Sequence, residues 1–401
     1  MDFSQVPVFS ALVAARLCLA LSPLPVDQVY KLANSPAVQE GVYLLQHGLD
    51  PYYEGAVRHS PLLLSLFSTV LPLTTLTAPL LWTACDAVSA WALVNIWRAR
   101  LNVSHSSRDA LVAASYLLNP YIVMPSLALS TSSYENALCL LALLFACRGQ
   151  RSMSLLTFAF LVQLSLSTVH LVIPLMLLIV TGPVSRLASP QPLDTDKIKL
   201  LPPLAAEFIL YSLFLTLAAT ISSGSCAWIE QSWMAPFLLP DLTPNTGLWW
   251  YYFTEMFDHF RPFFLMVFSV HLFIYVIPIC LKFQHDILYG WYLLLGVFAT
   301  FKSYPTLSDP GLFISMISVF PEVFPYLSYS VITGLLHLHA SLLLPLFHSL
   351  WLTQGTGNAN FFYASTLVFG MANGGVLLDS IRAGLRIAMG ELKYDHDVVQ
   401  E

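Results

Sequence analysis

Three ionisable residues, Glu255, Asp258 and His259, lie within five positions of one another in the stretch PDLTPNTGLWWYYFTEMFDHFRPFF, residues 240–264. On a helix that begins near Tyr251, their offsets of three and four place all three on one face. Such a face could ligate a divalent cation, hold a phosphate through that cation, or perform acid–base chemistry. For metal binding we favour the simpler interpretation of a solvated face. For polar contact with a headgroup or partner protein we favour function, because an apolar run follows directly.

The residues ahead of this trio carry turn and interface chemistry. Asp241 and Asn245 stand among prolines, threonines and a glycine between 240 and 247, a composition that favours tight turns. The aromatic run 249–253 is typical of a membrane interface, where amphipathic rings anchor a chain. We expect the turn to shape the mouth of a binding site, and the aromatic run to fix the depth of the helix that follows.

Two further segments offer polar candidates. GTGNANFFY, residues 355–363, contains Asn358 and Asn360, whose neutral amides could hold sugar hydroxyls or phosphate oxygens; capping of the helix that follows is an equally good interpretation. FKSYPTLSDP, residues 301–310, contains Lys302, which could neutralise an anionic headgroup or extend to the membrane interface.

Other kinds of chemistry lack support in the residues. The sequence contains no P-loop, GxSxG, HExxH or CxxC motif, and we expect no catalytic residue, metal or cofactor. Five of the six cysteines lie in apolar runs and only Cys226 falls in an extramembrane loop, which argues against a disulfide framework or a zinc site. The net charge of −6 provides no basic face for nucleic acid.

Composition indicates an integral membrane protein. Of the 401 residues, 57% are hydrophobic and only 10% are charged, against about 25% charged in an ordinary soluble domain. Apolar runs recur along the whole chain, so we predict one all-α polytopic domain, 1–401, with about twelve transmembrane helices. The runs are 6–24, 77–97, 110–126, 133–147, 153–167, 169–181, 200–222, 263–281, 287–301, 311–325, 327–352 and 361–385.

The distribution of Lys and Arg predicts the orientation of the bundle. These residues cluster in short connections that can all be cytosolic together, with both termini and the tail 386–401. The opposite, luminal side then holds a first loop with surface helices, a polar and aromatic segment, and two turns: residues 25–76, 223–262, 302–310 and 354–360. The single N-x-S/T sequon, at Asn102, falls in a loop that this arrangement places in the cytosol.

Ionisable residues inside the spans are costly and need partners. We expect Arg16 to pair with Asp86 between the first two spans, and Asp379 to pair with Arg382 three positions along one helix.

The segments quoted above, together with YLLNPY at 116–121, closely resemble the PIG-U subunit of the glycosylphosphatidylinositol (GPI) transamidase. The resemblance extends from the first luminal loop to the last helix, and it is weak in the N-terminal helix and after Met389. It implies a non-catalytic, multi-spanning subunit of an endoplasmic reticulum complex that replaces a C-terminal signal of proproteins with GPI. It also implies a role in holding or recognising the GPI lipid or the attachment signal. Implied partners are a caspase-like catalytic subunit, PIG-T, PIG-S and a Gaa-type subunit.

The same family is related to mannosyltransferases that use dolichol-phosphate mannose, and an enzyme of that kind is the alternative function. HGLDPYYEGAVRHSPLL, residues 47–63, is similar to a luminal loop of those enzymes, and a GT-C-like membrane fold is implied. Their carboxylate pair is missing here, because the corresponding place holds only Asp27; Asp50 and Glu54 could substitute. A transporter is a distant third hypothesis. We therefore expect 240–261 and 355–360 to converge at the luminal mouth of a GPI-holding platform.

Overall fold

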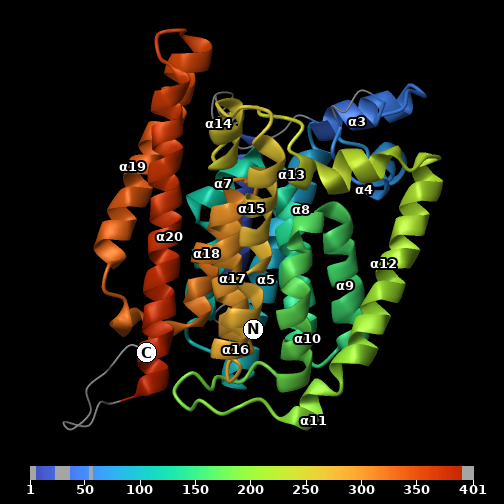
Figure 1. The fold of residues 1–401 in the computed structure, drawn as a ribbon. Helices are drawn as coiled ribbons and strands as arrows, with labels where there is room; N and C mark the ends of the chain where they lie inside the picture. Colours follow the sequence, from blue (N-terminus) through green and yellow to red (C-terminus); the bar gives the residue numbers. More distant parts are fainter. Residues whose placement is uncertain (1–5, 23–36, 54–56, 391–401) are drawn as a thin grey trace.

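The computed structural model describes residues 6–22, 37–53 and 57–390, and all the regular structure in these ranges is helical (Figure 1). Long helices run side by side through the body of the molecule. The principal ones are α1 Val6–Leu21, α5 Thr77–Leu101, α6 Asp109–Leu117, α7 Pro120–Leu127, α8 Ser132–Cys147, α9 Arg151–Leu164, α10 Val172–Thr181, α12 Leu201–Ser223, α15 Arg261–Phe273, α16 Val276–Lys282, α17 Ile287–Phe301, α18 Ser308–Met316, α19 Ser330–His348 and α20 Ala359–Met389.

Short helices connect the long ones. At the upper end of Figure 1 lie α3 Ala37–Gln46, α4 Pro61–Ser65, α13 Ala235–Leu238 and α14 Trp249–Thr254, and α11 Thr195–Ile198 lies at the lower end. Tighter or wider turns extend several helices: η1 Leu66–Val70, η2 Leu166–Leu171, η3 Ile229–Met234, η4 Ile317–Val319, η5 Pro321–Tyr326 and η6 Ser349–Thr353.

The helices occupy the twelve predicted apolar runs, and the prediction of a polytopic all-α membrane protein is confirmed. The predicted number of about twelve membrane crossings is not confirmed. Within the described residues, five helices are long and apolar enough to span a bilayer, or six if α6 and α7, bent by 50°, form one span. Proline is one physical reason: Pro120 follows Asn119, whose side chain accepts a hydrogen bond from the Tyr121 amide and starts a new helix. Short apolar helices of this kind are tolerated where neighbouring helices bury them.

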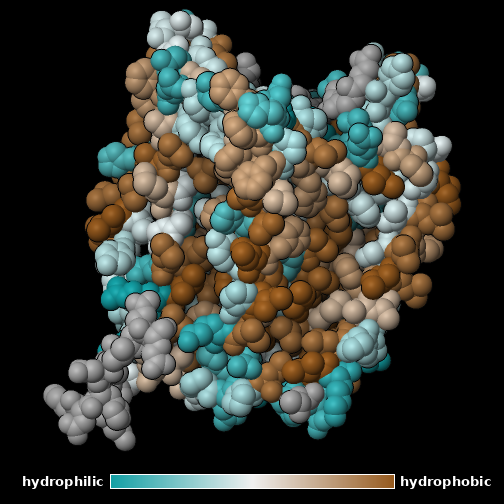
Figure 2. Space-filling model, in the orientation of Figure 1, coloured by the Kyte–Doolittle hydropathy of each residue, from teal (hydrophilic) through white to brown (hydrophobic). Residues whose placement is uncertain are grey.

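The centre of the bundle is α17, whose residues from Ile287 to Ala299 are all buried. Close packing depends on small residues, since a Cβ at Gly296 would lie 2.8 Å from the Phe313 ring of α18. By contrast, α12, α15 with α16, and α19 are apolar but mostly unburied. Figure 2 shows a hydrophobic band across the middle of one face, with polar residues gathered at both ends.

One predicted ion pair inside the bundle is confirmed and the other is wrong. Arg16 of α1 pairs with Asp86 of α5, and both side chains are buried. Asp379 instead accepts hydrogen bonds from the Ser328 and Tyr329 amides, at 3.0 and 2.9 Å. The backbone amides ahead of α19 therefore take the place expected for Arg382 as partners of the Asp379 carboxylate. The Arg382 guanidinium lies instead 5.8 Å from the Tyr329 ring centroid.

Contacts between distant loops define two ends of the bundle. At the upper end, Arg58 contacts Asp241, and Ser65 hydrogen-bonds Ser222 at 2.6 Å. At the lower end, Arg100 contacts Asp286, Glu322 and Ser185. The segments predicted to share one side therefore lie together, as do the basic connections opposite them.

Candidate functional site

The turn at 240–247 is held by its own side chains. Asp241 Oδ1 accepts a hydrogen bond from the Thr243 amide at 2.9 Å, and Asn245 Oδ1 accepts one from the Gly247 amide at 2.8 Å. Both are the local side-chain-to-backbone bonds that Asp and Asn favour in turns. The predicted turn chemistry is confirmed, and it fixes the direction in which the chain enters α14.

Two residues from other segments fasten this turn, and we call Arg58, Asp241 and Tyr304 the polar clamp. The Tyr304 hydroxyl donates to the Asp241 carbonyl at 2.9 Å and accepts from the Asp241 amide at 3.2 Å. Arg58 Nη1 donates to the Tyr304 hydroxyl at 3.1 Å, and Arg58 Nη2 lies 3.5 Å from Asp241 Oδ2. Burial raises the pKa of Tyr304, so its hydroxyl stays protonated and keeps its hydrogen bond to the Asp241 carbonyl.

The clamp also explains the glycine that ends the turn. A Cβ at Gly247 would lie 2.7 Å from the Pro305 ring, so only glycine permits this approach. The sequence analysis did not select Arg58 or Tyr304 as site residues. A usable signal existed, because Arg58 is a basic residue on the side of the bundle that holds few of them.

Three of the five rings of the aromatic run pack into the protein core, whereas Tyr251 and Tyr252 are half-buried, so the run serves packing between helices more than a membrane-facing belt. Trp249, Trp250 and Phe253 of α14 are all buried. Trp249 Nε1 donates to the Phe301 carbonyl at 3.0 Å, and its ring packs against Phe268 at a centroid distance of 5.1 Å. Other helices offer these rings apolar surface and a hydrogen-bond acceptor, which a lipid interface supplies less completely.

The 355–363 segment meets α14 through what we call the aromatic bridge: Trp250, Tyr251, Asn360 and Tyr363. The Tyr251 hydroxyl donates to Asn360 Oδ1, and the Tyr251 and Tyr363 rings lie 4.7 Å apart. The Tyr363 hydroxyl donates to the Leu248 carbonyl at 3.2 Å, and the Trp250 ring packs against Tyr363. The predicted convergence of 240–261 with 355–360 is therefore observed.

Asn358 fulfils the capping interpretation. Its Oδ1 accepts a hydrogen bond from the Phe361 amide at 3.3 Å, at the start of α20. Asn358 and Asn360 are both exposed, so their remaining amide atoms face outward beside the aromatic bridge. Capping and ligand contact are compatible at Asn358, because the cap uses only the side-chain oxygen.

Glu255, Asp258 and His259 do not share a helix face, contrary to the sequence prediction. Helix α14 ends at Thr254 and α15 begins at Arg261, so the three residues occupy the connecting turn, where all are exposed. Pro262 has no amide hydrogen and favours a helix start at this place. No group of three or more His, Cys, Asp or Glu residues that could hold a metal occurs in the described part of the chain.

Lys302 is buried rather than placed at an interface, which corrects both sequence interpretations. Its Nζ lies 2.9 Å from Asp309 Oδ1 and 3.6 Å from Glu135 Oε2. Asp309 also accepts a hydrogen bond from the Thr306 amide at 2.7 Å, so the FKSYPTLSDP segment supplies both the cation and a fixed partner for it. In this position Lys302 holds α17, α18 and α8 together.

The carboxylates considered for a mannosyltransferase offer little support for that function. Asp50 Oδ1 accepts a hydrogen bond from the Tyr52 amide at 2.9 Å, which is a local turn contact. Asp27 and Glu54 lie outside the described residues.

Residues 26–369 match the family model described as "GPI transamidase subunit PIG-U". The chain belongs to the PIG-U family. The match includes both the polar clamp and the aromatic bridge, whereas α1 and the tail after Met389 lie outside it, as the resemblance predicted.

Full-length relatives agree with this membership. The chain is 31% identical over 365 residues to "GPI transamidase component GAB1" of Saccharomyces cerevisiae, covering 90% of this chain and 86% of the yeast protein. It is 30% identical over 390 residues to human "GPI-anchor transamidase component PIGU", covering 90% and 87%. The Schizosaccharomyces pombe "GPI transamidase component GAB1 homolog" is 30% identical over 356 residues, covering 87% and 84%. These names favour a transamidase subunit over a mannosyltransferase.

Proposed function

We propose that this chain is a non-catalytic subunit of a GPI transamidase and that its upper end holds the GPI headgroup for a separate catalytic subunit. The convergence of 240–261 with 355–360 at one end of the bundle carries this proposal. Membership of the PIG-U family and the names of the relatives support it. The partners are a caspase-like catalytic subunit and PIG-T, PIG-S and Gaa-type subunits.

The chemistry of this end suits a glycan that carries phosphate and ethanolamine. Arg58 can donate charge-assisted hydrogen bonds to a phosphate, and Asn358 and Asn360 can meet hydroxyls or phosphate oxygens without burying charge. The exposed carboxylates of Glu255 and Asp258 can attract the ethanolamine amine. In this proposal the nucleophile for the peptide cleavage comes from the separate catalytic subunit.

The proposed location is the endoplasmic reticulum membrane, with the upper end luminal and both termini cytosolic. A glycosylation test uses an exposed turn: Gln354→Asn creates the acceptor Asn-Gly-Thr between α19 and α20, whereas the natural sequon at Asn102 lies at the lower end of α5. We expect glycosylation at position 354 and none at Asn102. The reverse pattern would refute the orientation.

The function is tested by rescue of surface GPI-anchored proteins in cells that lack PIG-U. We expect the intact chain to assemble with the other subunits and to rescue, and the Asn358→Ala/Asn360→Ala variant to assemble without rescuing. Loss of the Asn358 cap costs about 1 kcal/mol. The matched variant Asn358→Ser/Asn360→Ala, which retains a capping hydroxyl, therefore separates ligand contact from helix stability.

Two further results complete that test. Tyr251→Phe removes only the hydroxyl that orients Asn360, and we expect an intermediate rescue with normal assembly. An intact chain that neither assembles in a pull-down nor rescues would refute the subunit function and restore the mannosyltransferase hypothesis.

A further inference from the structure

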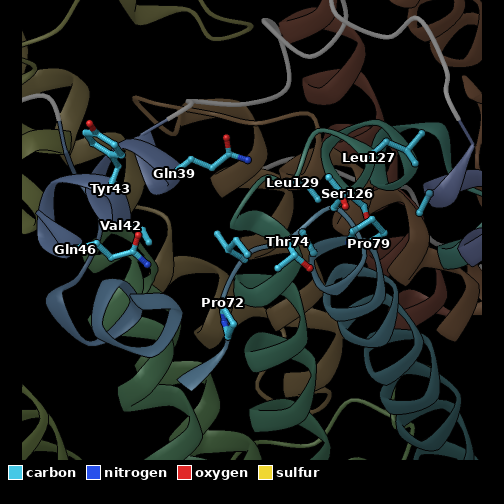
Figure 3. A pocket seen from close by; sticks show the side chains of 14 residues that line it. Gln39, Val42, Tyr43, Gln46, Pro72, Thr74, Pro79, Ser126, Leu127 and Leu129 are labelled. Carbon is cyan, nitrogen blue, oxygen red and sulfur yellow. The ribbon is translucent and has the colours of Figure 1, made fainter. Parts of the chain in front are cut away.

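A cavity of about 590 Å³ lies at the upper end of the bundle, and no residue of the clamp or the bridge lines it (Figure 3). Its walls come from α3, from the turn that leads into α5, and from the ends of α1 and α7. The volume falls within the range of about 300–1,000 Å³ that is usual for small-molecule pockets. The residues at its wall are Ala20, Gln39, Val42, Tyr43, Gln46, Pro72, Leu73, Thr74, Thr75, Ala78, Pro79, Ser126, Leu127 and Leu129.

One wall is a polar stripe on α3. Gln39, Tyr43 and Gln46 are separated by four and three positions, so they lie along one side of the helix. In Figure 3 the amides of Gln39 and Gln46 extend from α3 toward the middle of the cavity. All three side chains are exposed, and each amide offers two donors and an acceptor. Because Gln39 and Gln46 are seven positions apart, about 10 Å along the helix, their amides can bind hydroxyl groups that are well separated on a glycan.

The opposite wall carries hydroxyl groups. Thr74 and Thr75 lie on the turn before α5, and Ser126 lies near the end of α7. The Thr74 hydroxyl is 3.0 Å from the Thr77 hydroxyl, so it is already oriented by its own turn. None of the described residues that line the cavity is charged. A phosphate would therefore find no countercharge among these described lining residues, and an acyl chain would desolvate several polar groups.

A buried polar chain lies beneath the cavity. The Ser126 hydroxyl donates a hydrogen bond to Asp86 Oδ2 at 2.6 Å, and Arg16 Nη2 donates a second hydrogen bond to the same oxygen. Arg16 lies one helical turn before Ala20, which lines the cavity. Its Nε and Nη1 atoms are buried and have no hydrogen-bond partner within the described structure. This buried network joins α1, α5 and α7 beneath the cavity and so fixes the position of the wall that Ser126 and Ala20 form.

We infer that this cavity binds a neutral glycan, with Gln39 and Gln46 on one side and the Thr74 and Thr75 hydroxyls on the other. The Tyr43 ring at the rim suits the apolar face of a sugar ring. The inference rests on the proposed function, because it takes the glycan to be part of the GPI lipid held by this chain. The headgroup phosphate would remain at the polar clamp, which is a separate part of the same end.

The test measures binding of a tritium-labelled, deacylated GPI glycan to the purified full-length chain in detergent. We expect Gln39→Ala/Gln46→Ala to weaken binding at least tenfold. Glu40→Ala is the matched control, because Glu40 lies on the same helix but does not line the cavity, and its affinity should equal that of the intact chain. Inorganic phosphate should not displace the glycan from this cavity.

A second variant protects the test against misfolding of α3. Thr75→Val removes a hydroxyl from the opposite wall at nearly constant shape and leaves the Thr74–Thr77 turn intact, and we expect weaker binding with an unchanged melting temperature. Equal glycan affinity in the intact chain and in both cavity variants would overturn the inference. If that happens while the intact chain still assembles and rescues GPI anchoring, the proposed function stands; failure of assembly and rescue would instead refute the function itself.

Discussion

The two ends of the molecule each hold an arginine beside carboxylates, but they bury it to different degrees. At the lower end, Arg100 is 1% exposed and lies 2.9 Å from Asp286 and 2.6 Å from Glu322. At the upper end, Arg58 is 25% exposed and lies 3.5 Å from Asp241, which is itself 41% exposed. The lower pair closes the bundle, whereas the upper pair remains accessible and can exchange its partner for a ligand.

The difference has an energetic basis. Removing one member of a buried ion pair leaves its partner charged and unsolvated, at a cost of about 3–5 kcal/mol. An exposed pair is solvated on its own and contributes about 0–1 kcal/mol. Stability at the lower end and recognition at the upper end are thus separable by mutation.

The largest effect on stability is expected for Arg100→Met. Asp286 and Glu322 would lose their shared cation, and the guanidinium contact with the Phe320 ring at 4.4 Å would also disappear. We expect a loss of about 3–5 kcal/mol, measured by thermal unfolding of the purified chain in detergent. A loss below that of Arg58→Met would contradict the distinction between the two ends.

Gly247→Ala should have the next largest effect, because the added methyl would strike Pro305 beside the clamp. Overpacking of this kind costs about 1–3 kcal/mol. Gly334→Ala in α19 is the control, since nothing lies within 4 Å of a Cβ there. Unfolding should distinguish the two variants; equal stability would show that the turn at 240–247 adapts freely.

A smaller, pH-dependent effect is expected from His59, which neighbours Arg58. Burial lowers the pKa of His59 from 6.5 to about 4 in the folded chain, so protonation favours the unfolded state. The stability that neutral His59 contributes above pH 6.5 is therefore lost as the pH falls toward 4. His59→Gln, which cannot be protonated in this range, should show a shallower loss of melting temperature over the same interval. Parallel curves would exclude His59 as the cause.

The smallest effect on stability is expected for Arg58→Met, at about 0–1 kcal/mol. Its effect on function should be larger, because the clamp loses the cation proposed to meet the GPI phosphate. We expect normal assembly with reduced rescue in PIG-U-deficient cells, and partial recovery with Arg58→Lys. Full rescue by Arg58→Met would remove the clamp from the proposed binding site.

The predictions that failed depended either on where a helix ends or on contacts between distant residues. The offsets of Glu255, Asp258 and His259 fit a helix, but the chain turns there and restarts at Arg261. Lys302 was expected at an interface because Glu135 is 167 positions away in the sequence, and the packing of α8 against α18 brings them together. The capping by Asn358 and the turn at 240–247 were predicted correctly because they involve neighbours within a few residues.

The sequence by itself determined the class of the protein, the positions of its apolar helices, the short-range caps and turns, and the two sets of loops at opposite ends. These follow from composition, from the distribution of charge and from bonds between near neighbours. The tertiary structure decided that the aromatic run enters the core, that Arg58 and Tyr304 join the turn at Asp241, and that α3 and α7 enclose a cavity. Hydropathy cannot distinguish the buried α17 from the unburied α12, because both avoid water equally and only packing determines whether protein covers them.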